Sequence, residues 1–168
     1  MNLLIAAARL FGVGVVLALA SLGASAADSA GELSAIHAAD EIWVKAFNAG
    51  DVDTMVGCYA EHSVLLPPGA PPASGLPAIR SFFSKMVPGA VKEGLTFTLG
   101  PNPAGGVHGD FGWSSGTYVL KDKTDHVVET GKYLSVSKKK DGKWLYVRDT
   151  WNSDGPAPAT EPASGTKK

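Results

Sequence analysis

Few residues in this chain have the type and spacing of a known catalytic or metal-binding set. The four histidines are scattered, without the close i, i+4 pairing of a helical metal motif, so we expect no metal site. No motif for a nucleotide or other cofactor is present, and we expect none to bind. His62 follows Glu61 where a helix gives way to a strand, a position that suits general acid–base catalysis and equally suits a solvated turn histidine. Cys58 is the only cysteine, and its apolar neighbours indicate a buried, inert thiol.

Two further charged residues, Lys132 and Asp149, are expected inside the fold. The dipeptide Asp141-Gly142 is a strong hairpin signal, and pairing the residues on either side of it places Lys132 and Asp149 as diagonal neighbours on the more apolar face. That face should be the concave one. The pair is then either a structural ion pair or the polar floor of an apolar pocket, where it could orient a ligand or move a proton. A one-residue bulge in either strand would invert this assignment.

The same register surrounds this polar spot with aromatic and small polar side chains. Trp43, on the first helix, is expected as the opposite wall, although its helical spacing also fits an ordinary core residue. The candidate catalytic residues are Asp149, Lys132 and His62. The candidate ligand-binding residues are Trp43, Trp113, Ser115, Lys132, Asp149 and Trp151.

Three helices should position these residues from the N-terminal side. The first is expected to begin near Ser29, which has capping-box spacing, and to stop at Gly50. Asp51 is suited to cap a second, short helix. A third helix has Pro77 in its first turn and is expected to end at Pro88-Gly89.

Strands dominate the remainder of the chain. A short strand at 63–66 precedes a proline-rich loop, and residues 101–106 interrupt the later pattern. The long strands are expected at 112–120, 127–138 and 143–152, after a short one at 95–99. Helices followed by an antiparallel meander predict an α+β fold, with a cone-shaped, curved antiparallel sheet wrapped around the three N-terminal helices.

The first 26 residues have the pattern of a signal peptide. Arg9 provides a positive n-region, residues 10–22 form an uncharged apolar run, and Ala24-Ser25-Ala26 suits a signal peptidase. The run is shorter than the roughly 20 residues needed to span a bilayer. We therefore expect cleavage near Ala26 and a periplasmic or secreted product.

The mature chain should form one domain over residues 27–154, followed by a disordered tail at 155–168 that is rich in Pro, Ala, Ser and Gly. The whole chain has 15 basic and 16 acidic residues. A net charge so close to zero does not indicate a basic surface that would bind nucleic acid or an anionic membrane.

Four stretches of the sequence carry a family resemblance. Together they resemble the nuclear transport factor 2-like superfamily, and within it the secreted SnoaL-like proteins of unknown function that are related to ketosteroid isomerase. The resemblance implies the same cone of sheet and helices, and a homodimer formed through the sheet. The stretches are Ala46–Asp51, Tyr59–Gly69, Gly75–Phe82, and Gly131–Leu134 together with Arg148–Asp154.

The resemblance does not carry steroid isomerisation with it. Ketosteroid isomerases use an aspartate base and an oxyanion hole made of a tyrosine and a protonated aspartic acid. In an ungapped comparison Trp43 stands at the tyrosine, Leu66 or Pro67 near the base, and Lys132 near the acid. None of these residues can take over the original role, so we expect the chain not to be a functional ketosteroid isomerase.

Three functions fit the sequence. The first is an exported pocket protein that binds a small, partly apolar ligand, which accounts for the aromatic inner face and the lack of a catalytic set. The second is an acid–base enzyme, such as an isomerase, lyase or hydrolase, that uses Asp149 with Lys132 or His62. The third is a dimeric interaction scaffold with a vestigial pocket. We expect binding rather than catalysis.

Overall fold

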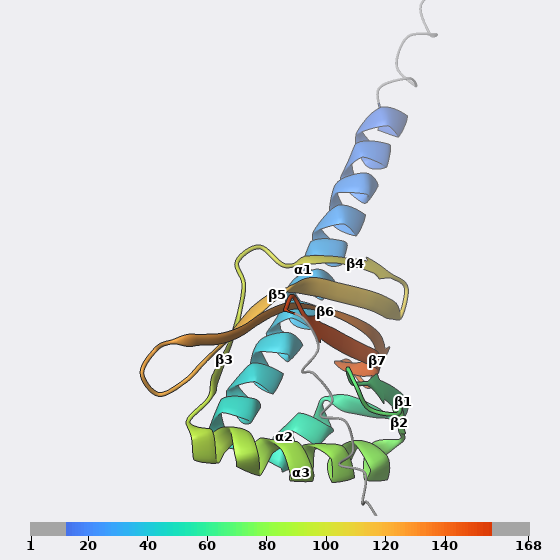
Figure 1. Cartoon of the computed structure of the whole chain (residues 1–168). Helices are drawn as coiled ribbons and strands as arrows, with labels where there is room; N and C mark the ends of the chain where they lie inside the picture. The colour runs from blue at the N-terminus through green and yellow to red at the C-terminus, as the bar shows by residue number, and fades with distance from the viewer. Residues whose placement is uncertain (1–12, 156–168) are drawn as a thin grey trace, which may run out of the picture.

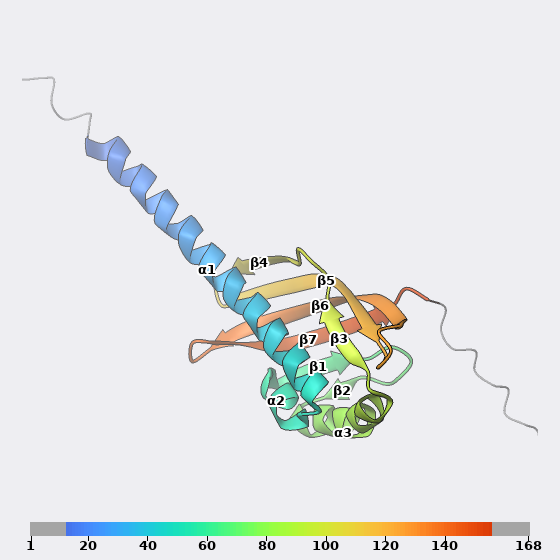
Figure 2. The same cartoon turned by 90° about the vertical axis from the view of Figure 1, so that its left-hand side faces the viewer.

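The computed structural model describes the backbone of residues 13–155 and the side chains of residues 28–155. The described helices precede the long strands in the chain, and shorter strands at 59–66 and 73–74 lie between the second and third helices (Figure 1). The sheet is curved and unclosed, and the helices lie against its concave side (Figure 2). This arrangement confirms the expected α+β fold.

Helix α1 (Val13–Ala49) is longer at its N-terminal end than the sequence predicts. It runs unbroken through the expected start at Ser29, because residues 13–27 are rich in alanine and leucine and contain no proline to stop a helix. Its first half projects away from the sheet in both views (Figures 1 and 2). At the other end Gly50 adopts φ 71° and ends the helix as expected. Asp51 then caps α2 (Val52–Gly57) by accepting from the Thr54 amide at 2.9 Å.

Helix α3 (Leu76–Glu93) also exceeds its expected length, because it continues past Pro88 to a left-handed C-cap at Gly94. Pro88 lies on the exposed side, where the carbonyl that loses its partner can be hydrated. The buried stripe of Ile79, Phe83 and Val87 holds the helix against the core on either side of that point. The expected end at Pro88-Gly89 is therefore corrected.

Within residues 13–155, seven strands form one sheet in the order β2-β1-β7-β6-β5-β3, and β4 pairs with the same strand, β5, as β3 does. All pairs are antiparallel except β1 with β7, which is parallel. Strand β4 was expected to be a loop, because Gly105 and Gly106 give it no hydrophobic pattern. The strands are β1 (Tyr59–Leu66), β2 (Ala73–Ser74), β3 (Thr96–Leu99), β4 (Ala104–His108), β5 (Phe111–Lys121), β6 (Val127–Lys140) and β7 (Lys143–Ser153).

The hairpin of β6 and β7 contains a bulge that decides which side chains face the helices. Close to the Asp141-Gly142 turn the register is the expected one, and Ser137 pairs with Tyr146. The next pair is Val136 with Arg148, so Val147 is an extra residue. Such a residue reverses the facing of one strand relative to the other. Beyond the bulge Asp149 therefore pairs with Ser135, and both are buried.

The concave face of the sheet is rich in small residues and tyrosines, whereas aliphatic side chains of β6 such as Val128 and Leu134 point outward. Gly112 shows why small residues are needed, because a Cβ atom built there would lie 2.3 Å from Cδ1 of Ile36 on α1. Gly131 is similarly covered by Tyr118, since its Cβ would lie 2.4 Å from the Tyr118 ring. The helix and the rings can approach the sheet only where side chains are missing.

Parts of the expected export signal and tail lie outside the described residues, namely residues 1–12 and 156–168. The intervening residues of the signal, 13–26, are α-helical and continuous with the rest of α1. Within the described part of the chain, no helix is long and apolar enough to cross a membrane.

Candidate functional site

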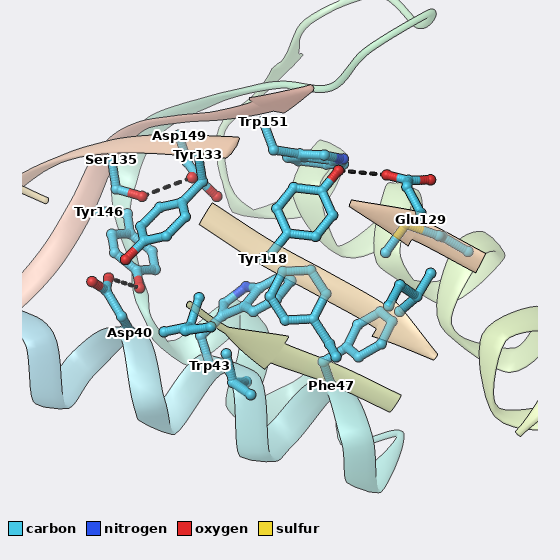
Figure 3. Close-up of a pocket in the computed structure, with 15 residues that line it drawn as sticks. Asp40, Trp43, Phe47, Tyr118, Glu129, Tyr133, Ser135, Tyr146, Asp149 and Trp151 are labelled. Carbon is cyan, nitrogen blue, oxygen red and sulfur yellow. Dashed lines mark hydrogen bonds between the residues drawn. The ribbon is translucent and has the colours of Figure 1, made fainter. Parts of the chain in front are cut away.

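A cavity of about 180 Å³ lies between α1 and the concave face of the sheet. Helix α1 provides one wall, β5, β6 and β7 provide the other, and β3 and α3 contribute at the sides (Figure 3). Its wall is mainly aromatic. The rings that line it are Trp43, Phe47, Phe97, Tyr118, Tyr133, Tyr146 and Trp151.

Packing among the rings fixes the apolar part of this wall. Trp43 stacks on Phe47 with ring centroids 5.7 Å apart, and Phe97 packs edge-on against both. Asn48 at the end of α1 holds β3 in place, because its side chain donates to the Phe97 carbonyl at 2.9 Å and accepts from the Phe97 amide at 2.7 Å. Phe97 then stacks on Tyr118 with centroids 4.8 Å apart. Contacts of this kind add to the stability that burial itself provides.

Asp40 is the buried acid of α1, and 4% of its surface is exposed. Its Oδ1 atom accepts a hydrogen bond from the Tyr146 hydroxyl at 2.6 Å. Its Oδ2 atom has no hydrogen-bond partner of normal geometry within the described part of the chain, but the hydroxyls of Ser114 and Tyr133 lie near enough to act on the Asp40 carboxylate. Burial raises the pKa of Asp40 above its ordinary value, and the bond from Tyr146 opposes this effect.

Asp149 is the buried acid of β7, and both of its oxygens are bonded. Tyr59 donates to Oδ2 at 2.5 Å and Ser135 donates to Oδ1 at 2.8 Å (Figure 3 shows the latter). Burial raises the pKa of Asp149 to about 6, against the effect of these two bonds, and the negative charge of Asp40 raises it further. The cavity thus contains a carboxyl group that can gain or lose a proton close to neutral pH.

A third acid, Glu129, lies at the opposite end of the cavity from Asp40 (Figure 3). It accepts a hydrogen bond from Tyr118. Two other polar atoms in the wall, Nε1 of Trp43 and the hydroxyl of Tyr133, are buried and have no partner among the described residues. Buried polar atoms without partners are uncommon, and here they line one cavity together with Oδ2 of Asp40.

The structure brings three of the residues singled out from the sequence to this cavity: Trp43, Asp149 and Trp151. Lys132 and Trp113 lie on the outer face of the sheet instead, because the less apolar face of β6 is the concave one, and β5 follows β6 through its pairing. The bulge at Val147 acts on β7, where it brings Asp149 and Trp151 to the concave face. Lys132 pairs with Asp154 at 2.7 Å rather than with Asp149.

Ser115 shares the outward face of β5 with Trp113, and His62 is exposed on β1. Neither lines the cavity. The expected facing of Trp113, Ser115 and Lys132 was therefore wrong.

Cys58 is buried, as its apolar neighbours indicate. Burial raises the pKa of its thiol to about 11, so the thiol remains protonated at neutral pH. Among the described residues, no three His, Cys, Asp or Glu side chains are grouped so that they could hold a metal ion.

Sequence reasoning missed Asp40, Glu129, Tyr133 and Tyr146 as members of the site. Asp40 lies on the same helical face as Trp43 and Phe47, which is a usable signal, because a lone acid on an apolar face is unusual. In the expected register, Tyr133 and Tyr146 lie on the less apolar face of the hairpin, which should point away from the helices. The alternation of glycine and serine at Gly112 and Ser114 could have identified the inner face of β5, since a helix needs small residues opposite it.

These features define a class of protein: a curved sheet closed on one side by helices, with an acidic and aromatic cavity between them. The chain belongs to the SnoaL-like domain family, whose model matches residues 41–147. Among curated proteins, none matches the chain significantly.

Solved structures show the same fold at low sequence identity. A nuclear transport factor 2-like protein with a cystatin-like fold from Novosphingobium aromaticivorans superimposes with TM-score 0.67 at 17% identity, over 90% of this chain and 95% of that one. A nuclear transport factor 2-like protein of unknown function from Pseudomonas putida gives 0.66 at 17% identity, over 73% and 87%. A ketosteroid isomerase-like protein from Erwinia carotovora atroseptica gives 0.59 at 20% identity, over 74% and 98%.

Proposed function

We propose that this protein binds a small, partly apolar molecule in the cavity between α1 and the sheet. The observation that carries the proposal is the set of three buried polar atoms without partners, on Asp40, Trp43 and Tyr133, in a wall that is otherwise aromatic. A few placed polar groups in an apolar, concave site are typical of a pocket for a small molecule. Such groups are costly when left unpaired, and a ligand can supply the missing partners.

The test is a binding measurement with a blocked cavity. Leu99 on β3 lines the cavity and is half-buried, whereas its neighbour Thr98 points outward and is exposed. Leu99→Trp should abolish the binding of a neutral apolar probe such as Nile red, measured by fluorescence titration. Thr98→Trp adds the same side chain to the same strand and should leave binding unchanged. Equal binding by both variants would refute the cavity as the site.

Export of the protein is part of this proposal. It is supported by the signal-like sequence of residues 1–26, and removing these residues costs the domain none of the contacts described here. The first of those contacts along α1 come from Glu32, which accepts from Trp144 at 2.8 Å and pairs with Lys139. The intact mass of the protein recovered from a periplasmic extract should correspond to a chain that begins near Ala27.

A second candidate function is acid–base catalysis in the same cavity. It is favoured by Asp149, whose pKa of about 6 matches the requirement of a group that must both give and take a proton near neutral pH. In that case Asp149→Asn should abolish turnover of a substrate while its binding survives. If the protein only binds its ligand, neither the unaltered protein nor Asp149→Asn should show turnover, and the substitution should change only the affinity.

We also propose that two copies associate through the outer face of the sheet. Trp113, Val128 and Leu134 lie on this face of β5 and β6, and each is between 42% and 47% exposed. Clusters of exposed apolar side chains on a soluble domain are typical of an interface.

A further inference from the structure

The charges around the cavity are all of one sign. Three acids line it, Asp40, Glu129 and Asp149, and none of the residues lining it is a lysine, arginine or histidine. The lysine expected there, Lys132, lies on the outer face and is paired with Asp154. A cleft lined by charge of a single sign attracts ligands of the opposite sign and repels those of the same sign.

The buried acids are also close enough to disfavour one another's charge. The negative charge of Asp40 raises the pKa of Asp149, and no cation from the lining residues compensates the pair. His37 and Glu41, on its own helix, also act on Asp40, and so do Cys58, Tyr133 and Tyr146 from the elements packed against that helix. A cation placed inside the cavity would lower the cost of keeping both carboxylates ionised.

The unpartnered oxygen of Asp40 indicates what kind of cation. Both oxygens of Asp149 already accept hydrogen bonds, whereas Oδ2 of Asp40 accepts none of normal geometry from the described residues. An N–H group of a ligand could donate to the carboxylate of Asp40, which lines the cavity. A quaternary ammonium ion has no such hydrogen and would leave the acceptor unpaired.

The aromatic wall suits the remainder of such a ligand. The rings of Trp43, Phe47 and Phe97 offer apolar surface to a hydrocarbon group. Aromatic faces also carry a partial negative charge that attracts cations, with tryptophan the most effective.

We propose that the ligand is a small protonated amine, whose ammonium group donates to the carboxylate of Asp40 while its hydrocarbon part lies against Trp43, Phe47 and Phe97. This inference rests on the proposed binding function and specifies its ligand class. It excludes carboxylates and other anions as ligands.

Three probes of similar size test the inference by isothermal titration calorimetry on the unaltered protein at pH 7. They are 2-phenylethylamine, 2-phenylethanol and phenylacetate, which carry a positive, a neutral and a negative group on the same ring. The amine should bind about tenfold or more tightly than the alcohol, since a hydrogen bond between charged groups contributes more than a neutral one. Phenylacetate should not bind.

A pair of variants then assigns the effect to Asp40. Asp40→Asn should lower the affinity for the amine about tenfold or more and leave that for the alcohol almost unchanged. Glu41→Gln removes the neighbouring, exposed carboxylate of α1 and should change neither affinity by more than about twofold. Far-ultraviolet circular dichroism shows whether the Asp40→Asn variant has folded. If it has not, the three probes still test the inference on the unaltered protein.

The outcomes separate this inference from the function on which it rests. If the alcohol or phenylacetate binds as tightly as the amine, the amine inference is overturned and the binding function remains. If none of the three probes binds and Nile red does not bind either, both are overturned.

Discussion

The hydroxyl of Tyr146 donates to Oδ1 of Asp40 at 2.6 Å, across 106 residues of sequence. Both side chains are almost completely buried, at 4% exposure each. This bond joins the last strand to the first helix at one end of the cavity. It also fixes the position of the Asp40 carboxylate beside the cavity, so the geometry of the site depends on it.

Removing this bond should destabilise the fold. Tyr146→Phe leaves a buried carboxylate oxygen without a partner, and we expect the free energy of unfolding to fall by about 1–3 kcal/mol in urea titrations. Tyr133→Phe is the matched control, because that hydroxyl has no partner among the described residues. Its effect should stay within about 0.5 kcal/mol. An equal loss in both variants would mean that Tyr133 also bonds Asp40.

The ionisation of Asp149 should make stability depend on pH. Its pKa is about 6 in the folded protein against an ordinary 3.8, so the folded state holds the proton more tightly. The contribution to stability is then full below about pH 4 and is lost as pH rises through 6, with a total of about 3 kcal/mol. Urea titrations between pH 4 and 7.5 measure it.

The variant Asp149→Asn isolates this contribution from those of other groups. It cannot ionise, so the difference in unfolding free energy between the unaltered protein and the variant should shift in favour of the variant as pH rises from 4 to 7. Exposed acids with lowered pKa values, such as Asp51 and Asp122, also make stability depend on pH. Their contribution is the same in both proteins, so it cancels in the difference. A difference that is independent of pH would contradict the raised pKa.

The glycines beneath the rings should be intolerant of substitution. A Cβ at Gly131 would lie 2.4 Å from both the Asn152 carbonyl and the Tyr118 ring, neither of which can move freely. Gly131→Ala should therefore cost about 1–3 kcal/mol. Gly89 on α3 has no atom within 4 Å of its would-be Cβ, and Gly89→Ala should stabilise the protein by roughly 0.5–1 kcal/mol. Thermal unfolding of the two variants gives opposite shifts if this is correct.

The outer face of the sheet should carry the dimer. Sedimentation velocity of the unaltered protein is expected to show a dimer, and Leu134→Asp should raise its dissociation constant at least about tenfold, because a buried unpaired charge is costly. Ile42 on α1 is 50% exposed and lies away from this face, so Ile42→Asp should have no effect. A monomer at all concentrations, or equal dissociation by both variants, would exclude this interface.

Local sequence signals predicted most of the elements. The cap at Asp51, the stop at Gly50 and the turn at Asp141-Gly142 each depend on residues within a few positions, and all three occur as expected. The helices and long strands follow from their hydrophobic periods for the same reason. The α+β class, which needs only the order of these elements, was therefore accessible from the sequence.

The side chains that line the cavity could not be predicted in the same way. Asp149 faces the cavity because of the extra residue at Val147 in β7, and no local pattern marks it. The assumption that the more apolar face of the sheet is the concave one was also wrong. The concave face carries glycine, serine and tyrosine because α1 must approach it closely, whereas Trp113 and Leu134 face outward. The sequence by itself determined the elements and placed Asp149 in the site. Only the tertiary structure decided that its neighbours are Tyr59, Ser135 and Asp40 rather than Lys132, because packing between distant segments sets the register.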